Sequence, residues 1–313
     1  MTPRSSLPLW AALLGSAVAG VLTAIQSRVN GGLSLALGNG YLTAAVSFGS
    51  GLLILSLVML ASRSGRAGLG LVREELRRRH LPWWALAGGA CGAFFVLGQG
   101  TTAPLLGLAL FTVGVVAGQV LGGLLIDRLG IGPSGRIAPT TPRLVGTVLA
   151  IVAVILSVVV DLGSTGLTVL LVIVPFIAGA LVSWQSAVNG LLRSAAHSAI
   201  TATFLSFVVG TSVLVVVAGV SVAVQGWPET WPSNPLFYSG GFLGVIFIAL
   251  LATLVRRAGV LLLSMSNVAG QLVAAVALEA SVPLAAGVTP WMLAGTVLAL
   301  VAVGIAAISG RSR

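Results

Sequence analysis

Charged side chains are scarce in this sequence. Only 7% of its 313 residues are charged and 57% are hydrophobic, whereas a soluble domain is roughly 25% charged. This composition excludes a water-soluble enzyme. Runs of about 20 apolar residues recur from end to end, which is the length that a helix needs to cross a bilayer. The sequence therefore predicts an all-α polytopic membrane protein.

Cysteine and histidine are almost absent too. The single cysteine, Cys91, excludes an internal disulfide framework and is expected to pack among apolar neighbours. His80 and His197 have no sequence neighbours that would complete a metal site, and the glycines between positions 65 and 70 lack the strand and helix that flank a nucleotide loop. Because no nucleophile and base pair is evident either, we expect no enzyme, no cofactor and no bound metal.

A six-residue phrase occurs twice in the chain. Residues 26–31 read Gln-Ser-Arg-Val-Asn-Gly, and residues 185–190 read Gln-Ser-Ala-Val-Asn-Gly, 159 positions later. Further phrases match at offsets of 152 and 149, among them Ala117-Gly118-Gln119 with Ala269-Gly270-Gln271. Matches that keep one order along the whole chain indicate a duplication. We expect two repeats of five helices each, residues 1–162 and 163–313.

Ten apolar spans follow from this division. Because each half has an odd number of helices, the second half must enter the membrane in the opposite orientation, and the two repeats are inverted. The apolar run after Arg4 imitates a signal peptide, but its repeat partner is internal, so we expect a retained first helix. The predicted spans are 9–27, 41–61, 82–101, 105–126, 142–161, 166–186, 198–222, 236–255, 259–279 and 289–309.

The arginines predict the orientation of these spans. All sixteen basic residues are arginines, and one orientation places fifteen of them on the cytoplasmic side, with only Arg28 outside. Since arginine-rich loops remain in the cytoplasm, we expect both termini to be cytoplasmic. The net charge of +10 is then explained by topology and by contact with membrane lipid, and no nucleic-acid partner is predicted.

Polar side chains within the spans are the candidate substrate-binding residues, because they are costly at membrane depth and often functional. Hydrogen bonds between helices would explain the amides near the helix ends equally well, whereas a functional role is favoured for Gln119 and Gln271. The repeat pairs Gln26 with Gln185, Asn30 with Asn189, and Gln119 with Gln271. On the predicted spans, Gln26 and Asn30 lie at the outer end of the first helix, and Gln185 and Asn189 lie at the inner end of the sixth. Gln119 and Gln271 lie deeper in the membrane.

Trp184 lies directly before the second copy of the phrase. All seven tryptophans lie near span ends, as expected of side chains that anchor a helix at the membrane interface. Trp184 is therefore either an interfacial anchor or a residue that stacks on the substrate.

Carboxylates are nearly absent from the spans. Asp127 ends the fourth span and Glu279 ends the ninth, so these two acids are candidates for proton coupling, although interfacial charge is the simpler interpretation. Arg28 departs from its repeat partner Ala187. This difference motivates the hypothesis that Arg28 and Glu279 form an ion pair that closes the outer side.

Several of these motifs together have a known counterpart. The two Gln-x-x-x-Asn-Gly phrases, Pro82-Trp83-Trp84 ahead of Gly88-Gly89, and Ala117-Gly118-Gln119 leading to Asp127 resemble the ten-helix drug/metabolite transporter superfamily, and within it the YdcZ-like branch. The resemblance implies a bacterial inner-membrane protein that works by alternating access, with the substrate held between the halves. Small multidrug relatives rely on a buried Glu in the first helix, which this chain lacks.

We expect a secondary transporter or facilitator of a small polar metabolite. Inverted repeats place substrates near the midplane, so Gln119 and Gln271 are expected nearest the substrate, with the other four amides towards the two mouths. One alternative is a proton-coupled exporter of cationic drug-like compounds, with Asp127 or Glu279 carrying the proton. A further alternative is a non-transporting membrane scaffold or sensor.

Overall fold

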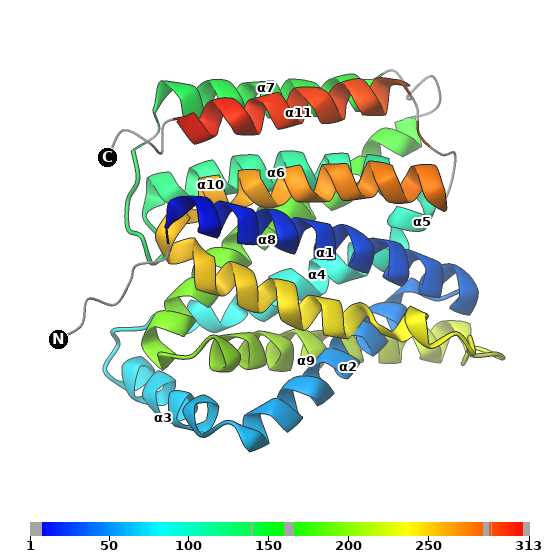
Figure 1. Ribbon diagram of the computed structural model, residues 1–313. Coiled ribbons are helices and arrows are strands. Elements are labelled where there is room, and N and C mark those ends of the chain that lie inside the picture. The colour runs from blue at the N-terminus through cyan, green and yellow to red at the C-terminus, as the bar shows by residue number, and fades with distance from the viewer. Residues whose placement is uncertain (1–7, 139, 160–165, 284–287, 289, 309–313) are drawn as a thin grey trace.

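The computed structural model is a bundle of helices (Figure 1), and in the described part of the chain every regular element is a helix. The boundary predicted between residues 162 and 163 lies outside the described residues, as do Arg4, Arg311 and Arg313. The structure describes residues 8–138, 140–159, 166–283, 288 and 290–308.

The helices fall on all ten predicted spans. The elements are α1 (Leu9–Leu37), α2 (Gly40–Ala61), α3 (Arg63–Arg77), η1 (Trp83–Ala87), α4 (Gly88–Thr101), α5 (Ala103–Leu106), α6 (Leu108–Leu129), α7 (Thr141–Val159), α8 (Gly166–Ala196), α9 (Ala199–Gln225), η2 (Pro235–Tyr238), α10 (Gly240–Ser281) and α11 (Pro290–Ile308).

Among the residues that the structure describes, six helical segments are long and apolar enough to cross a membrane. They are Leu9–Leu37, Gly40–Ala61, Ala103–Leu129, Leu171–Ala196, Ala199–Gln225 and Pro235–Ser281. The apolar stretches within α7 and α11 are shorter. The prediction of an all-helical membrane protein is confirmed by these segments.

Two breaks in the helices occur at repeat-related glycines. Gly259 has a φ of 74° and divides α10 into two segments. Gly107, which is 152 positions earlier, has a φ of 78° and separates α5 from α6. Because residues other than glycine rarely adopt a positive φ, glycine at both positions lets the chain turn sharply between two helices.

The starts of α2 and α9 are also built alike. The side chain of Asn39 accepts a hydrogen bond from the Leu42 amide at 2.9 Å, and the Ser198 hydroxyl accepts one from the Thr201 amide at 3.3 Å. Each side chain satisfies one of the free amides at a helix start. Asn39 and Ser198 are 159 positions apart, so the repeat extends to the caps.

The bundle is organised by close helix pairs. α1 packs along α10, α6 along α8, α2 along α9, and α7 along α11. Figure 1 shows α7 and α11 side by side at one edge of the bundle and α3 at the opposite edge. The beginning of α1 and the end of α11 lie at the same end of the bundle as α3.

Glycine permits the two closest crossings. A methyl group at Gly118 on α6 would overlap the carbonyl oxygen of Phe176 on α8, and one at Gly270 on α10 would overlap that of Ala17 on α1. Gly118 and Gly270 are repeat partners at an offset of 152, and Ala17 and Phe176 are repeat partners at an offset of 159. Small residues that let backbones approach are the usual means of helix packing in lipid.

The basic helix α3 is amphipathic and lies against the bundle. Its buried face contains Gly65, Gly68 and Val72, and the hydroxyl of Thr201 on α9 donates to the Gly65 carbonyl at 2.8 Å. Its arginines at 63, 66, 73 and 77 are exposed. The apolar face is thus covered by protein, and the charged face remains open to lipid headgroups or water.

Candidate functional site

A small, partly open pocket, called the cavity below, lies between the two halves of the chain. Its walls pack so closely that no space for a water-sized sphere remains inside. The ten residues that line it form five repeat-related pairs: Gln26 and Gln185, Phe48 and Phe207, Gly92 and Gly244, Phe95 and Phe247, and Val96 and Ile248. None of these ten carries a charge. The cavity therefore has matching walls from each half.

Phenylalanine rings form the apolar wall. Phe48 on α2 stacks on Phe207 on α9, with ring centroids 4.8 Å apart and planes 29° apart. Each ring lies over a glycine of the other helix, because a methyl group at Gly210 would overlap Phe48 and one at Gly51 would overlap Phe207. These glycines allow the two helices to bring the rings face to face.

Two buried amides form the polar wall. Gln26 on α1 packs on Gly244 of α10, and Gln185 on α8 packs on Gly92 of α4. A methyl group at either glycine would collide with the amide nitrogen above it. The exposed fractions of the two glutamines are 1% and 3%. The glycines of α4 and α10 thus make the space in which the repeated glutamines reach the cavity.

This placement corrects the expectation that Gln26 and Gln185 lie at opposite mouths. The predicted spans stopped at residues 27 and 186, but α1 continues to Leu37 and α8 continues to Ala196. The helices continue through their polar residues because these side chains hydrogen-bond inside the bundle instead of facing lipid. Both glutamines consequently line one cavity.

In the first half, the amide of Gln26 is hydrogen-bonded at both ends. Its Nε2 donates to the Gly240 carbonyl at 2.7 Å, and its Oε1 accepts from Gln99 Nε2 at 3.3 Å. Gln99 also donates to the Ser27 hydroxyl at 2.8 Å and accepts from Asn30 Nδ2 at 2.7 Å. Gln99 therefore joins α4 to three polar residues of α1.

The second half has a smaller network. Gln185 Nε2 donates to the Ser206 hydroxyl at 3.1 Å, and Asn189 Nδ2 approaches the same oxygen at 3.4 Å. The carbonyl oxygen of Gln185 accepts no hydrogen bond from the described residues, and that of Asn189 is buried without a partner among them. The position equivalent to Gln99 is Leu251, which is buried and apolar.

Gln119 and Gln271 are not among the residues that line this cavity. Gln119 Oε1 accepts a hydrogen bond from Asn267 Nδ2 on α10 at 2.9 Å. The side-chain nitrogens of both glutamines are buried without a partner in the described part of the chain. Both residues lie at close helix crossings, where Gly179 faces the Gln119 backbone and Gly20 faces the Gln271 backbone. Their contact with substrate stays a prediction.

Asp127 anchors one helix to another. Its Oδ1 accepts from the Val260 amide at 2.8 Å and its Oδ2 accepts from the Leu261 amide at 3.0 Å. These amides begin the segment of α10 that follows the break at Gly259, where free N–H groups and the helix dipole favour a negative charge. Asp127 is only 3% exposed. The carboxylate is therefore a buried helix cap and not the solvated interfacial charge that the sequence suggested.

Arg28 contacts the end of α10 that carries Glu279. The Arg28 Nε donates to the carbonyl of Val282, the C-cap of α10, at 3.0 Å. Glu279 lies one turn earlier and is 2% exposed. Arg28 thus satisfies a terminal carbonyl of the helix, and its ion pair with Glu279 stays a prediction.

Trp184 has a structural neighbour. Its ring lies 5.4 Å from that of Trp84, with the planes tilted by 46°. This pairing gives Trp184 a packing role between α8 and η1. Stacking of Trp184 on a substrate stays a prediction.

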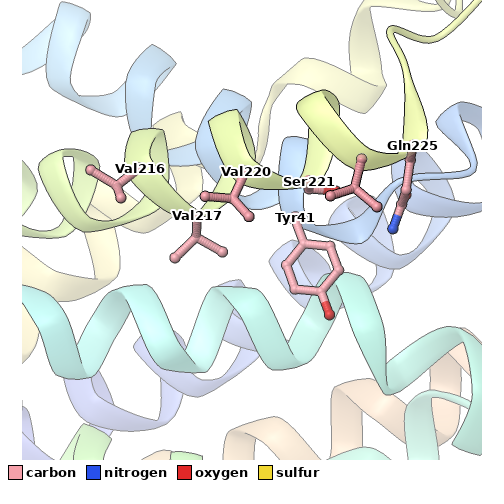
Figure 2. Close-up of a pocket in the computed structure, with 7 residues that line it drawn as sticks. Tyr41, Val216, Val217, Val220, Ser221 and Gln225 are labelled. Atoms are coloured by element: carbon pink, nitrogen blue, oxygen red, sulfur yellow. The ribbon is translucent and has the colours of Figure 1, made fainter.

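A second hollow lies on the surface between α2 and α9. Figure 2 shows Tyr41 below α9, whose residues Val216, Val217, Val220, Ser221 and Gln225 follow the groove. Val216 and Val220 are about two-thirds exposed, at 66% and 62%. An open apolar groove on the surface of a membrane bundle suits lipid chains better than a polar substrate.

Sequence reasoning missed the phenylalanines of the site. Phe48 and Phe207 are part of repeated Ser-Phe phrases, so their pairing could be read from the sequence, but their meeting across the two halves could not. Gln99 was recognisable only as a polar residue within a span. Its partners Gln26, Ser27 and Asn30 lie about 70 positions away.

Comparison with known proteins identifies the family. The model of a family described as "Putative inner membrane exporter, YdcZ" matches residues 11–156 and 170–308. No curated protein matches the sequence. A solved structure titled "Crystal structure of protein" is similar with a TM-score of 0.62 and 16% identity over 96% of each chain, a likeness that shows the fold alone. Since the family model covers nearly the whole chain, the protein belongs to the YdcZ family of the drug/metabolite transporter superfamily.

Proposed function

We propose that the protein is a secondary transporter or facilitator that moves a small uncharged polar molecule through the cavity between its two halves. The observation that carries this proposal is the composition of that cavity, whose ten lining residues form five repeat-related pairs. Inverted-repeat transporters place their substrates near the midplane at the interface of the repeats. The membership of an inner-membrane exporter family supports the same class of activity.

The proposed architecture has ten membrane spans in two inverted repeats of five, with both termini in the cytoplasm. The five helix pairs related by the repeat support it: α1 with α8, α2 with α9, α4 and α6 with the two segments of α10, and α7 with α11. The matching close crossings at Gly118 and Gly270 support it as well. Rocking of one half against the other would widen the cavity and open it to each side in turn.

The lining residues favour an uncharged substrate. Desolvating an ion requires a compensating charge, and the cavity wall offers amides and rings instead. An amide can both donate and accept a hydrogen bond, which suits neutral polar groups. The site is therefore centred on Gln26 and Gln185, with Gln119 and Gln271 outside its wall.

Proton-coupled export of cationic compounds is the competing proposal. Asp127 is a buried carboxylate, as a proton carrier must be. However, its two oxygens accept backbone hydrogen bonds at the start of a helix segment, and each protonation would weaken this cap at one of the two oxygens. This arrangement favours an anchoring role for Asp127.

Flux into proteoliposomes tests the proposal. The purified full chain is reconstituted and assayed with labelled amides, polyols, neutral amino acids and lipophilic cations, each with and without a pH gradient. Saturable flux of an uncharged compound that does not require the gradient supports the proposal. Flux confined to cations and dependent on the gradient would instead support the proton-coupled exporter. No saturable flux of any compound would favour a scaffold or sensor.

A further inference from the structure

The two glutamines of the cavity have the same position in their repeats but different surroundings. Gln26 has a hydrogen bond at each end of its amide, to the Gly240 carbonyl and to Gln99. Gln185 has one, to the Ser206 hydroxyl at 3.1 Å. The difference at the carbonyl oxygen corresponds to one sequence change, because Gln99 in the first half is replaced by Leu251 in the second.

Gln99 determines how freely Gln26 can respond to a ligand. Gln99 is fully buried, with an exposed fraction of 0%, and its amide bonds Gln26, Ser27 and Asn30 together. Turning Gln26 towards a ligand would break part of this network and leave buried polar atoms without partners, which is costly. The Gln26 amide is therefore a fixed wall of the cavity.

Gln185 is under no such restraint. The carbonyl oxygen of Gln185 accepts no bond from the described residues, and Leu251 offers none. Because this oxygen lies at the wall of the cavity with its acceptor sites unused, it can accept a hydrogen bond from a ligand. Once the cavity opens to admit a ligand, a donor group on that ligand can bond this oxygen without competing for the Gln185 Nε2 bond to Ser206.

We propose that Gln185, and not its repeat partner Gln26, is the amide that binds the substrate, and that the substrate is a flat uncharged molecule with an amide-like edge. This inference rests on the proposed function. The donor and acceptor of such an edge match the open amide of Gln185. Its flat faces match the rings of Phe48, Phe207, Phe95 and Phe247 around the cavity.

The two halves of the chain therefore contribute differently to the site. The first half supplies a rigid network that preserves the cavity, and the second supplies the adaptable contact. Gln185 is thus a substrate-contacting residue, and Gln99 is a positioning residue that acts through Gln26.

The test compares matched variants at repeat-related positions. Uracil and nicotinamide serve as flat amide probes and glycerol as a non-planar neutral probe. Binding is measured from the probe-dependent rise in melting temperature of the full chain in detergent, and flux is measured in proteoliposomes. The variants are Gln185→Ala, Gln26→Ala and Gln99→Leu. Gly49→Ala is the control, because a methyl group there meets no atom within 4 Å.

Substitution of Gln185 should affect mainly probe affinity, whereas substitution of Gln26 or Gln99 should affect mainly the ligand-free melting temperature. Gln185→Ala should weaken binding of a flat probe about tenfold, the value of one lost hydrogen bond, while the ligand-free melting temperature stays within about 2 °C of the parent. Gln26→Ala and Gln99→Leu should lower the ligand-free melting temperature by about 3 °C or more and weaken binding less than Gln185→Ala does.

Two results would overturn the inference. One is equal loss of probe affinity in Gln26→Ala and Gln185→Ala. The other is saturable flux of glycerol or another non-planar compound without binding of uracil or nicotinamide, which would leave the proposed function standing. Absence of flux for every compound of the wider panel would instead reject both the proposed function and this inference.

Discussion

The rings of Phe48 and Phe207 stack across the two halves of the chain, with their centroids 4.8 Å apart. The two residues are 159 positions apart and occupy the same place in the repeated sequence. In the proposed inverted-repeat architecture, two residues related by the two-fold axis touch only at that axis, so this contact would lie at the centre of the duplicated structure. The cavity lined by Gln26 and Gln185 adjoins the same pair.

Substitution of the stacked rings should reveal their coupling. Phe48→Leu, Phe207→Leu and the double variant form a cycle, for which we expect a coupling free energy of about 0.5–1.5 kcal/mol from the lost ring pair. Denaturant or thermal unfolding of the purified variants measures it. Strict additivity of the two single effects would show that the rings do not depend on each other.

The close helix crossings should not tolerate a methyl group. Gly118→Ala and Gly270→Ala each place a methyl against a backbone carbonyl oxygen, and overpacking of this kind costs about 1–3 kcal/mol. Gly49→Ala and Gly219→Ala are the controls, because each methyl would enter open space. Melting temperatures of the four variants test this, and equal values for the crossing and control variants would contradict the packing argument.

Asp127 should matter more for stability than for transport. Asp127→Ala removes the acceptors of the Val260 and Leu261 amides, and leaving them buried without partners costs about 1–3 kcal/mol. Asp127→Asn keeps one acceptor oxygen and should lose less. Glu74→Ala, which breaks an exposed pair with Arg78, is expected to have little effect.

Flux separates the anchoring role of Asp127 from proton carriage. An anchor predicts that Asp127→Asn retains flux per folded molecule at pH 6 and at pH 8. If this variant kept its melting temperature and lost all flux, Asp127 would be a proton carrier instead.

The orientation can be measured with single cysteines. Cys91 is the only cysteine, so Cys91→Ser gives a background without thiols. Ser64→Cys on α3 and Ser233→Cys before η2 both lie at exposed positions. An impermeant maleimide added to intact spheroplasts should label only the second. Labelling of the first alone would reverse the predicted topology.

The helix positions could be predicted from the sequence because apolar runs and the duplication agree on them. The lengths of α1 and α8 could not, since Gln26 and Asn30 were taken as signs of a span end. Hydropathy measures each side chain alone, whereas these amides are satisfied by Gln99 and Gly240, which are distant in the sequence. The same reason explains why Asp127 was read as an interfacial charge.

The site could be predicted only in part. The repeat pointed to Gln26 and Gln185 as a matched pair, but not to their meeting at one cavity. The difference between them depends on Gln99 and Leu251, which are equivalent only after the repeat is extended to α4 and α10. Contacts between distant helices decide which amide is bonded and which is open.

The most direct test of the central claim is ligand-dependent thermal stabilisation of the full chain and of Gly92→Val, with a panel of neutral metabolites and cations at pH 6 and pH 8. The valine side chain would occupy the space of the Gln185 amide. We predict that uncharged polar compounds raise the melting temperature of the parent at both pH values and leave that of folded Gly92→Val unchanged. Equal shifts in both proteins, or shifts by cations alone and mainly at pH 8, would contradict a central site for neutral substrates.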